Sequence, residues 1–127
     1  MIKEFGSSQA IGDYIDTKID GSFLVSDIDF LGSYVSKLKS EDMYLEIGTG
    51  HGKSMASAIW QAKEGIKFFT VDIEDFSITT TSRMSRQEFF ESEGLDTVCT
   101  FIKDESLNVA KNWSQGLFSM IFIDAIH

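Results

Sequence analysis

From Met43 onward, short apolar runs alternate with segments of helical character, and this alternation restricts the fold more than any other feature. The runs are rich in β-branched and aromatic residues and cover residues 43–47, 67–72, 97–103 and 118–124. The helices predicted between them lie near residues 53–63, 82–93 and 105–113. Such a pattern is typical of parallel strands joined by crossover helices. It predicts an α/β fold with a three-layer, Rossmann-like parallel sheet.

Two more helices are predicted before the first strand, and neither carries obvious chemistry. Ser7 or Ser8 is expected to cap the first helix and Gly21 to end it, while Ser26 or Asp27 is expected to cap the second. Both have apolar residues at helical spacing, as packing elements do. We therefore expect one domain over residues 1–127, with a helical lead-in at 1–41 and βαβ units at 42–127.

Composition and charge favour a cytoplasmic protein and disfavour a nucleic-acid substrate. The net charge of −9 disfavours nucleic acid, because phosphate binding relies on clustered Lys and Arg. The longest uninterrupted apolar stretch, residues 120–123, is far shorter than the roughly 20 residues that cross a bilayer. No secretory leader is visible at the N-terminus. The single cysteine, Cys99, lies in an apolar run and is expected to be a buried hydrophobe without a catalytic role.

A glycine-rich turn follows the first strand and carries the strongest chemical signal. Glu46, Gly48, Gly50 and Gly52 alternate with other residues directly before a predicted helix. Glycine permits positive φ and a close approach of backbone to ligand, and the helix start offers free N–H groups. A dinucleotide fingerprint would place the third glycine one position later. The spacing therefore differs from that of a nicotinamide site.

This pattern resembles the first motif of class I S-adenosylmethionine-dependent methyltransferases, in which the loop holds the methionine part of the cofactor. The resemblance implies a cofactor site that includes Glu46, Gly48, Thr49, Gly50 and Gly52, and a sheet of order 3-2-1-4. The bound cofactor would be S-adenosyl-L-methionine. His51, inside the same turn, is expected to line the pocket rather than to act as a base.

Asp72 ends the second apolar run, about 20 residues beyond the glycine turn, where a ribose-binding acid is expected. Its carboxylate is suited to accept hydrogen bonds from both ribose hydroxyls. In the family the matching acid has this role, and the next residue, here Ile73, packs on the adenine face. Asp75 competes for the same task, and a solvated acid at a strand end is the structural alternative.

Asp104 follows the third run, where the family usually has an acid that accepts from the adenine amino group. Asp104 is equally suited to cap the next helix. Many relatives have a glycine before this acid, and Lys103 departs from that pattern. The choice between Asp104 and Glu105 therefore stays open at this point.

The fourth run ends at Asp124, and His127 follows shortly after. This segment resembles methyltransferases of small molecules or sugars, in which an Asp and a nearby His face the methyl group being transferred. Asp124 and His127 are thus the candidate catalytic residues, with the imidazole as general base. In some relatives the Asp binds a divalent metal, but Ile126 stands where they often have a polar residue, so no metal site is predicted.

The complete family fold has three further strands, so the sequence is expected to be truncated after the fourth strand. That strand would then be an exposed apolar edge, which favours pairing with another copy in a homo-oligomer. The predicted function is methyl transfer from S-adenosylmethionine to a small-molecule or sugar-like acceptor. A NAD-dependent Rossmann oxidoreductase and a non-catalytic nucleotide-binding or assembly module are the alternatives.

Overall fold

A computed structural model of the chain describes residues 3–48, 50, 52–77 and 84–123. The elements follow in the order α1 (Ser8–Asp16), α2 (Val25–Val35), β1 (Met43–Ile47), α3 (Lys53–Gln61), β2 (Lys67–Asp72), α4 (Arg86–Glu93), the 3-10 helix η1 (Leu95–Thr97), β3 (Cys99–Lys103), α5 (Ser106–Asn112) and β4 (Met120–Ile123). The predicted alternation of strands and helices after two leading helices is confirmed.

The strands form one parallel sheet in the order β3-β2-β1-β4, as predicted. Ile47, the last residue of β1, pairs with Val71 on one side and with Ile123 on the other. The carboxyl ends of the three strands therefore lie side by side. The strand order reverses at β1, and ligands of open α/β sheets bind at such a point.

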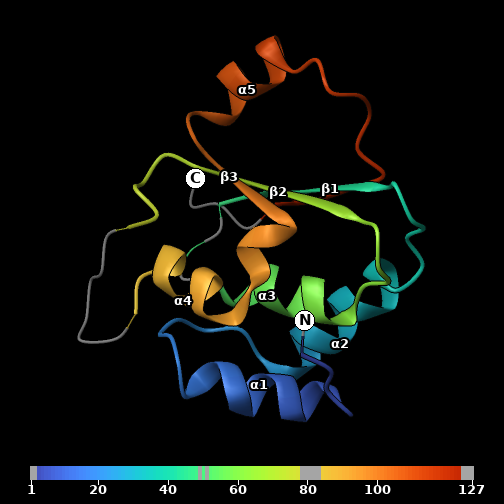
Figure 1. Cartoon of the computed structure of the whole chain (residues 1–127), viewed down its shortest axis with the longest axis vertical. Helices are drawn as coiled ribbons and strands as arrows, with labels where there is room; N and C mark the ends of the chain where they lie inside the picture. Colours follow the sequence, from blue (N-terminus) through green and yellow to red (C-terminus); the bar gives the residue numbers. More distant parts are fainter. Residues whose placement is uncertain (1–2, 49, 51, 78–83, 124–127) are drawn as a thin grey trace.

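Helices cover both faces of the sheet and give three layers (Figure 1). The layer of α2, α3 and α4 lies on one face, α1 packs outside α2 and α3, and α5 lies on the opposite face. A right-handed crossover from β3 to β4 runs in the opposite direction along the sheet from the crossovers before it, so its helix must lie on the other face. The three-layer prediction is confirmed.

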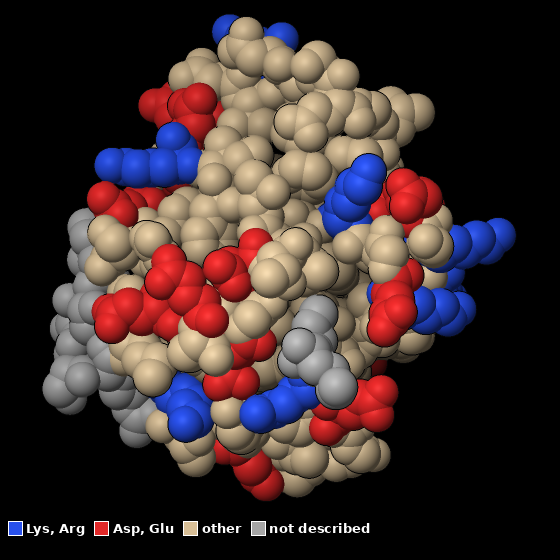
Figure 2. Space-filling view, viewed as in Figure 1, with Lys and Arg blue, Asp and Glu red and all other residues tan. Residues whose placement is uncertain are grey.

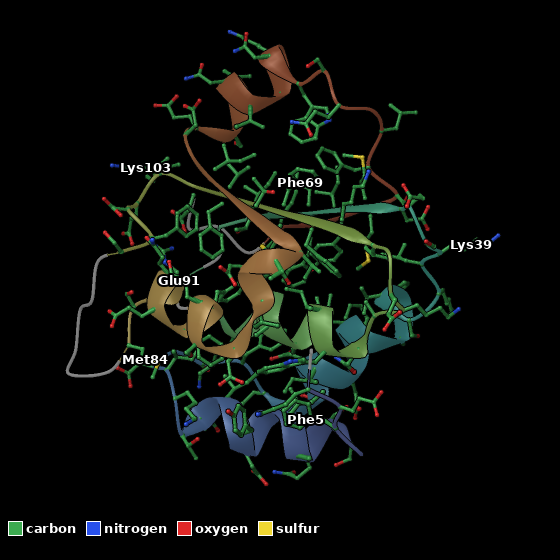
Figure 3. All side chains as sticks on the ribbon, in the orientation of Figure 1. Phe5, Lys39, Phe69, Met84, Glu91 and Lys103 are labelled. Carbon is green, nitrogen blue, oxygen red and sulfur yellow. The ribbon has the colours of Figure 1, made fainter. Side chains whose placement is uncertain are left out.

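The alternation of side chains along β1 and β2 divides the core between the two faces. Tyr44 and Phe68 lie in the larger cluster beneath α2, α3 and α4, with ring centroids 5.4 Å apart. Leu45 and Phe69 lie in the smaller cluster beneath α5. Figure 3 shows Phe69 between the sheet and α5, and Phe5 beside α1.

Both tryptophans pack in these clusters. Trp60 of α3 lies against Phe5 and Tyr14, with ring centroids 4.8 and 5.9 Å away. Trp113, directly after α5, packs edge-on against Phe69 at 5.0 Å, and its Nε1 donates to the carbonyl of Gly116 at 2.8 Å. Trp60 therefore joins the N-terminal helices to the βαβ layer.

Tyr14 provides a second link between α1 and the rest of the molecule and predicts a pH dependence. Its hydroxyl donates to Glu93 Oε2 at 2.7 Å. Burial, followed by the hydrogen bond and the charge of Glu93, raises the pKa of Tyr14 from 10.0 to about 12. Folding thus favours the protonated phenol, so its stabilising effect is complete below pH 10 and is lost as the pH rises toward 12. Urea titrations of wild type and Tyr14→Phe across this range should show a steeper loss in wild type; parallel curves would contradict the assignment.

Three predicted helix boundaries are wrong. The first helix ends at Asp16, with Thr17 as its C-cap, rather than at Gly21. The second helix begins at Val25, before both predicted caps, because Asp27 turns back and accepts from the Leu24 amide at 3.0 Å. The fourth begins at Arg86 rather than at residue 82, because Ser85 and Glu88 form a capping box at its start.

The third strand begins two residues later than predicted. Thr97 belongs to the 3-10 helix, and Cys99 is the first strand residue. Gly94 ends α4 with a φ of 72°, and the Thr97 hydroxyl donates to its carbonyl at 2.8 Å. This bond keeps the chain turning through residues whose β-branched side chains favour a strand.

β4 forms one edge of the sheet, and two of its apolar side chains are exposed, as predicted. Ile121 and Ile123 are 52% and 59% exposed. Pairing of this edge with another copy stays a prediction. None of the helices in the described ranges is long and apolar enough to span a membrane.

Candidate functional site

The glycine turn starts where β1 ends and is tied to the neighbouring strand. The Gly48 amide donates to the carbonyl of Val71, the residue before Asp72, at 2.9 Å. Gly48, Gly50 and Gly52 have φ values of 81°, 59° and 100°. Only residues without a Cβ adopt such angles at low cost, so the three glycines together form the turn. Gly52 then leads directly into α3.

Asp72 lies beside this turn at the end of β2. Its side chain is 13% exposed, and its Oδ2 accepts from Arg86 Nη1 at 2.9 Å. Its Oδ1 accepts from the Glu74 amide at 3.1 Å. The carboxylate is thus ordered at the same edge of the sheet as the glycines, and a solvated acid is no longer an adequate description.

The competing acid, Asp75, is used in a local turn. Its Oδ1 accepts from both the amide and the hydroxyl of Ser77, at 2.8 and 2.6 Å. These hydrogen bonds are the main reason that the pKa of the Asp75 carboxyl is held below its usual value. Asp72 is therefore the better placed of the two acids to meet a ligand beside the glycines.

The other predicted adenine contacts lie next to Asp72. Ile73 is 68% exposed, which leaves its apolar surface available. The Asp104 amide donates to the Asp72 carbonyl at 3.0 Å, so the ends of β2 and β3 are joined. The N-cap of α5 is Glu105, not Asp104. The Asp104 carboxylate accepts instead from the Glu105 amide at 2.7 Å, and Lys103 before it extends away from the molecule (Figure 3).

Glu46 has a different position from the other predicted cofactor residues. Its side chain is completely buried, at 0% exposure, on the face of β1 that carries Tyr44. Its predicted role toward the cofactor stays a prediction. Thr49, His51, Asp124 and His127 lie outside the described residues, and their predicted roles stay predictions.

Two charged residues beside the turn were not predicted. Arg86 is 5% exposed and Lys53 is 8% exposed. Lys53 begins α3, and its ammonium pairs with Asp16 at the end of α1. Arg86 begins α4, and its Cγ would lie 3.7 Å from a Cβ at Gly52. The capping box at Ser85 was the sequence signal that fixes Arg86 in the first turn of its helix.

A separate apolar cavity of about 490 Å³ lies on the α5 side of the sheet. It is lined by residues of β1, β2, α5 and β4, among them Ile47, Val71, Val109, Trp113 and Ile121. None of the predicted cofactor residues that the structure describes is in its lining. The predicted cofactor residues at the strand ends and this apolar cavity are therefore separate features of the molecule.

The family of the chain follows from a comparison with known domains. Residues 45–127 match a family model described as a methyltransferase domain. The chain belongs to this methyltransferase domain family. The matched segment begins in β1, directly before the glycine turn, and includes β2, β3 and β4. The resemblance inferred from the glycine turn is thus confirmed.

Solved structures show that the methyltransferase domain fold extends over nearly the whole chain. The structure of a Klebsiella pneumoniae protein described as an O-methyltransferase matches this chain with a TM-score of 0.67 and 18% sequence identity. The match covers 98% of this chain and 56% of that one. TomG from Streptomyces achromogenes, an O-methyltransferase of tomaymycin synthesis solved with SAM, matches with a TM-score of 0.65 and 18% identity, over 98% of this chain and 56% of TomG. Cofactor-bound Rv0187 from MTB matches with a TM-score of 0.64 and 17% identity, over 93% of this chain and 51% of Rv0187. The chain spans about half the length of these proteins. No curated protein sequence matches it.

Within this methyltransferase domain, Cys99 is 6% exposed, and burial together with the charge of Glu46 raises the pKa of its thiol. An inert thiol agrees with the predicted lack of a catalytic role. The described residues contain no group of three His, Cys, Asp or Glu side chains that could hold a metal ion.

The surroundings of Gly50 and Gly52 predict unequal effects of substitution at these two positions. A Cβ at Gly52 would lie 3.0 Å from Phe90 Cε1, whereas a Cβ at Gly50 would meet no atom of the described residues within 4 Å. We expect Gly52→Ala to lower the free energy of unfolding by about 2–4 kcal/mol, from backbone strain and overpacking together. Gly50→Ala should cost about 1 kcal/mol, from the left-handed φ alone. Urea unfolding of both variants measures the difference, and equal losses would contradict the packing of Gly52 on Phe90.

Proposed function

We propose that this chain binds S-adenosylmethionine at the ends of β1, β2 and β3, and that it is the cofactor-binding part of an enzyme that methylates a small-molecule or sugar-like acceptor. The observation that carries the proposal is the hydrogen bond from the Gly48 amide to the Val71 carbonyl, at 2.9 Å. It joins the glycine turn to the strand that ends in Asp72. A donor-rich turn and a carboxylate thus meet at one edge of a parallel sheet.

The residues at this edge fit the parts of the cofactor. The turn at 48–52 would hold the methionine part, and the Asp72 carboxylate would accept from the ribose hydroxyls. The exposed side chain of Ile73 would pack on the adenine, with Asp104 as acceptor for its amino group. When bound, the sulfonium supplies the methyl group.

Acidic surroundings also suit a cationic cofactor. α4, which begins beside the site, carries Glu88, Glu91 and Glu93, and Figure 2 shows acidic groups gathered in the region of this helix. The net charge of the chain is −9. Such a field attracts cations and repels polyanions, which supports a small acceptor over nucleic acid.

The acceptor side of the proposal concerns the end of β4. Asp124 and His127 are proposed to face the methyl group, with the imidazole taking the proton of the nucleophile. A histidine with an ordinary pKa near 6.5 suits this task at neutral pH. Because β4 pairs with β1 up to Ile123, β4 ends beside the end of the strand that leads into the glycine turn.

Isothermal titration of the chain with S-adenosylhomocysteine tests the proposal, with circular dichroism as a check of folding. We expect saturable binding by wild type and by Asp75→Ala. Asp72→Asn keeps an acceptor for Arg86 but removes the charge, and should weaken binding about 10- to 100-fold through the loss of charge-assisted hydrogen bonds. A folded chain that binds NAD but not S-adenosylhomocysteine would support an oxidoreductase, and one that binds neither would contradict a cofactor role.

A further inference from the structure

We propose that Arg86 is a positioning residue for the nucleoside: its guanidinium fixes the Asp72 carboxylate in the orientation that the ribose diol requires. The inference rests on the proposed function and deepens it, because it assigns recognition of the ribose to a pair of residues rather than to Asp72 alone. The sequence pattern gave Arg86 no role, since 14 positions separate it from Asp72.

The hydrogen bonds of Asp72 leave room for a diol. Each carboxylate oxygen has two acceptor sites. Asp72 Oδ2 accepts a hydrogen bond from Arg86 Nη1 at 2.9 Å, and Asp72 Oδ1 accepts one from the Glu74 amide at 3.1 Å. With these donors from the described part of the chain, one further site remains on each oxygen, so that two neighbouring hydroxyls can bind while the carboxylate keeps its orientation.

Arg86 is the more deeply buried partner of the ion pair. The Arg86 side chain is 6% exposed, and the Asp72 side chain is 13% exposed. A ligand therefore approaches Asp72 without displacing Arg86. This arrangement is that of a support behind a binding group, not of a residue that occupies the ligand's place.

Arg86 is itself held from several sides. Its Nη2 donates to the Asp75 carbonyl at 2.9 Å, and its guanidinium lies over the Phe76 ring at 4.5 Å. Phe76 in turn stacks on Phe101 of β3, with ring centroids 4.7 Å apart. The two-pronged donation to Asp72 and Asp75 needs the fixed fork of an arginine, which lysine lacks.

Stability alone gives little reason for an arginine here. It occupies the first turn of α4, where the positive end of the helix dipole disfavours a cation. A buried ion pair also adds little net stability compared with apolar residues of the same size. The arrangement is better explained by the orientation that it gives to Asp72.

The test compares S-adenosylhomocysteine with its 2′,3′-dideoxy analogue by isothermal titration. In wild type the diol should improve affinity about 10- to 100-fold, the effect of hydrogen bonds to a charged group. In Arg86→Gln this ratio should fall about tenfold, while affinity for the dideoxy analogue changes less than about threefold, because only the diol uses the orientation of Asp72. Arg86→Lys should reduce the ratio to an intermediate value. Gln87→Ala, an exposed neighbour on the same helix, is the matched control and should keep the wild-type ratio.

Three outcomes overturn the proposal in distinguishable ways. A folded wild-type chain that fails to bind S-adenosylhomocysteine overturns the proposed function, and the role of Arg86 with it. In folded Arg86→Gln, an unchanged ratio with both affinities at their wild-type values overturns the role of Arg86 alone. An equal loss of affinity for both ligands shows that Arg86 has only a structural role. If Arg86→Gln does not fold, the ratio in Arg86→Lys decides between these readings.

Discussion

Replacing Asp72 with alanine is expected to lower the free energy of unfolding by about 3–5 kcal/mol, a large part of the stability of a small domain. The substitution leaves the guanidinium of Arg86 buried without its carboxylate. Urea unfolding followed by circular dichroism measures the loss. Asp75→Ala is the matched control, because it removes only local bonds to Ser77, and should cost less than about 1 kcal/mol.

A double variant separates the ion pair from other effects of the Asp72 substitution. Asp72→Ala combined with Arg86→Met removes both charges, and an apolar replacement of a buried pair is far less costly than loss of one partner. The double variant should therefore be more stable than Asp72→Ala. A double variant less stable than either single one would contradict the pairing.

Phe90→Ala is expected to cost about 3–5 kcal/mol, as truncation of a buried aromatic residue generally does. Phe90 is fully buried, and its ring lies 5.2 Å from that of Phe101. It also forms the surface on which Gly52 rests, so the variant should weaken S-adenosylhomocysteine binding. Phe30→Ala provides the comparison, because this phenylalanine is 62% exposed, and should change stability by less than about 1 kcal/mol. Comparable losses in the two variants would show that Phe90 is not part of the core.

The strands were predictable because each combines a short apolar run with a polar residue at its end. Val71 followed by Asp72 is typical: burial ends at the point where the chain leaves the sheet. The sheet order was implied by the family resemblance rather than by the runs themselves. Boundaries were less predictable, because a single hydrogen bond such as that from Thr97 to Gly94 overrides the strand preference of a β-branched residue.

The site was predicted only in part. Asp72 could be found because it ends a strand at a known spacing from the glycines. Arg86 could not be found, because its contact with Asp72 forms only when α4 packs beside β2. No local sequence pattern predicts that contact. The cavity beneath α5 was unpredictable for the same reason, since its walls combine β1 and β2 with the distant segment from α5 to β4.

The central claim is that the glycine turn and Asp72 together bind a sulfonium nucleoside. Heteronuclear correlation spectra of isotopically labelled chain, recorded during a titration with S-adenosylhomocysteine, test it most directly. We predict saturable shifts concentrated at the amides of Gly48, Gly50, Gly52 and Ile73, with those of Val109 in α5 and of Trp113 directly after it unchanged. Shifts confined to the α5 side of the sheet, or none at saturating ligand, would contradict the claim.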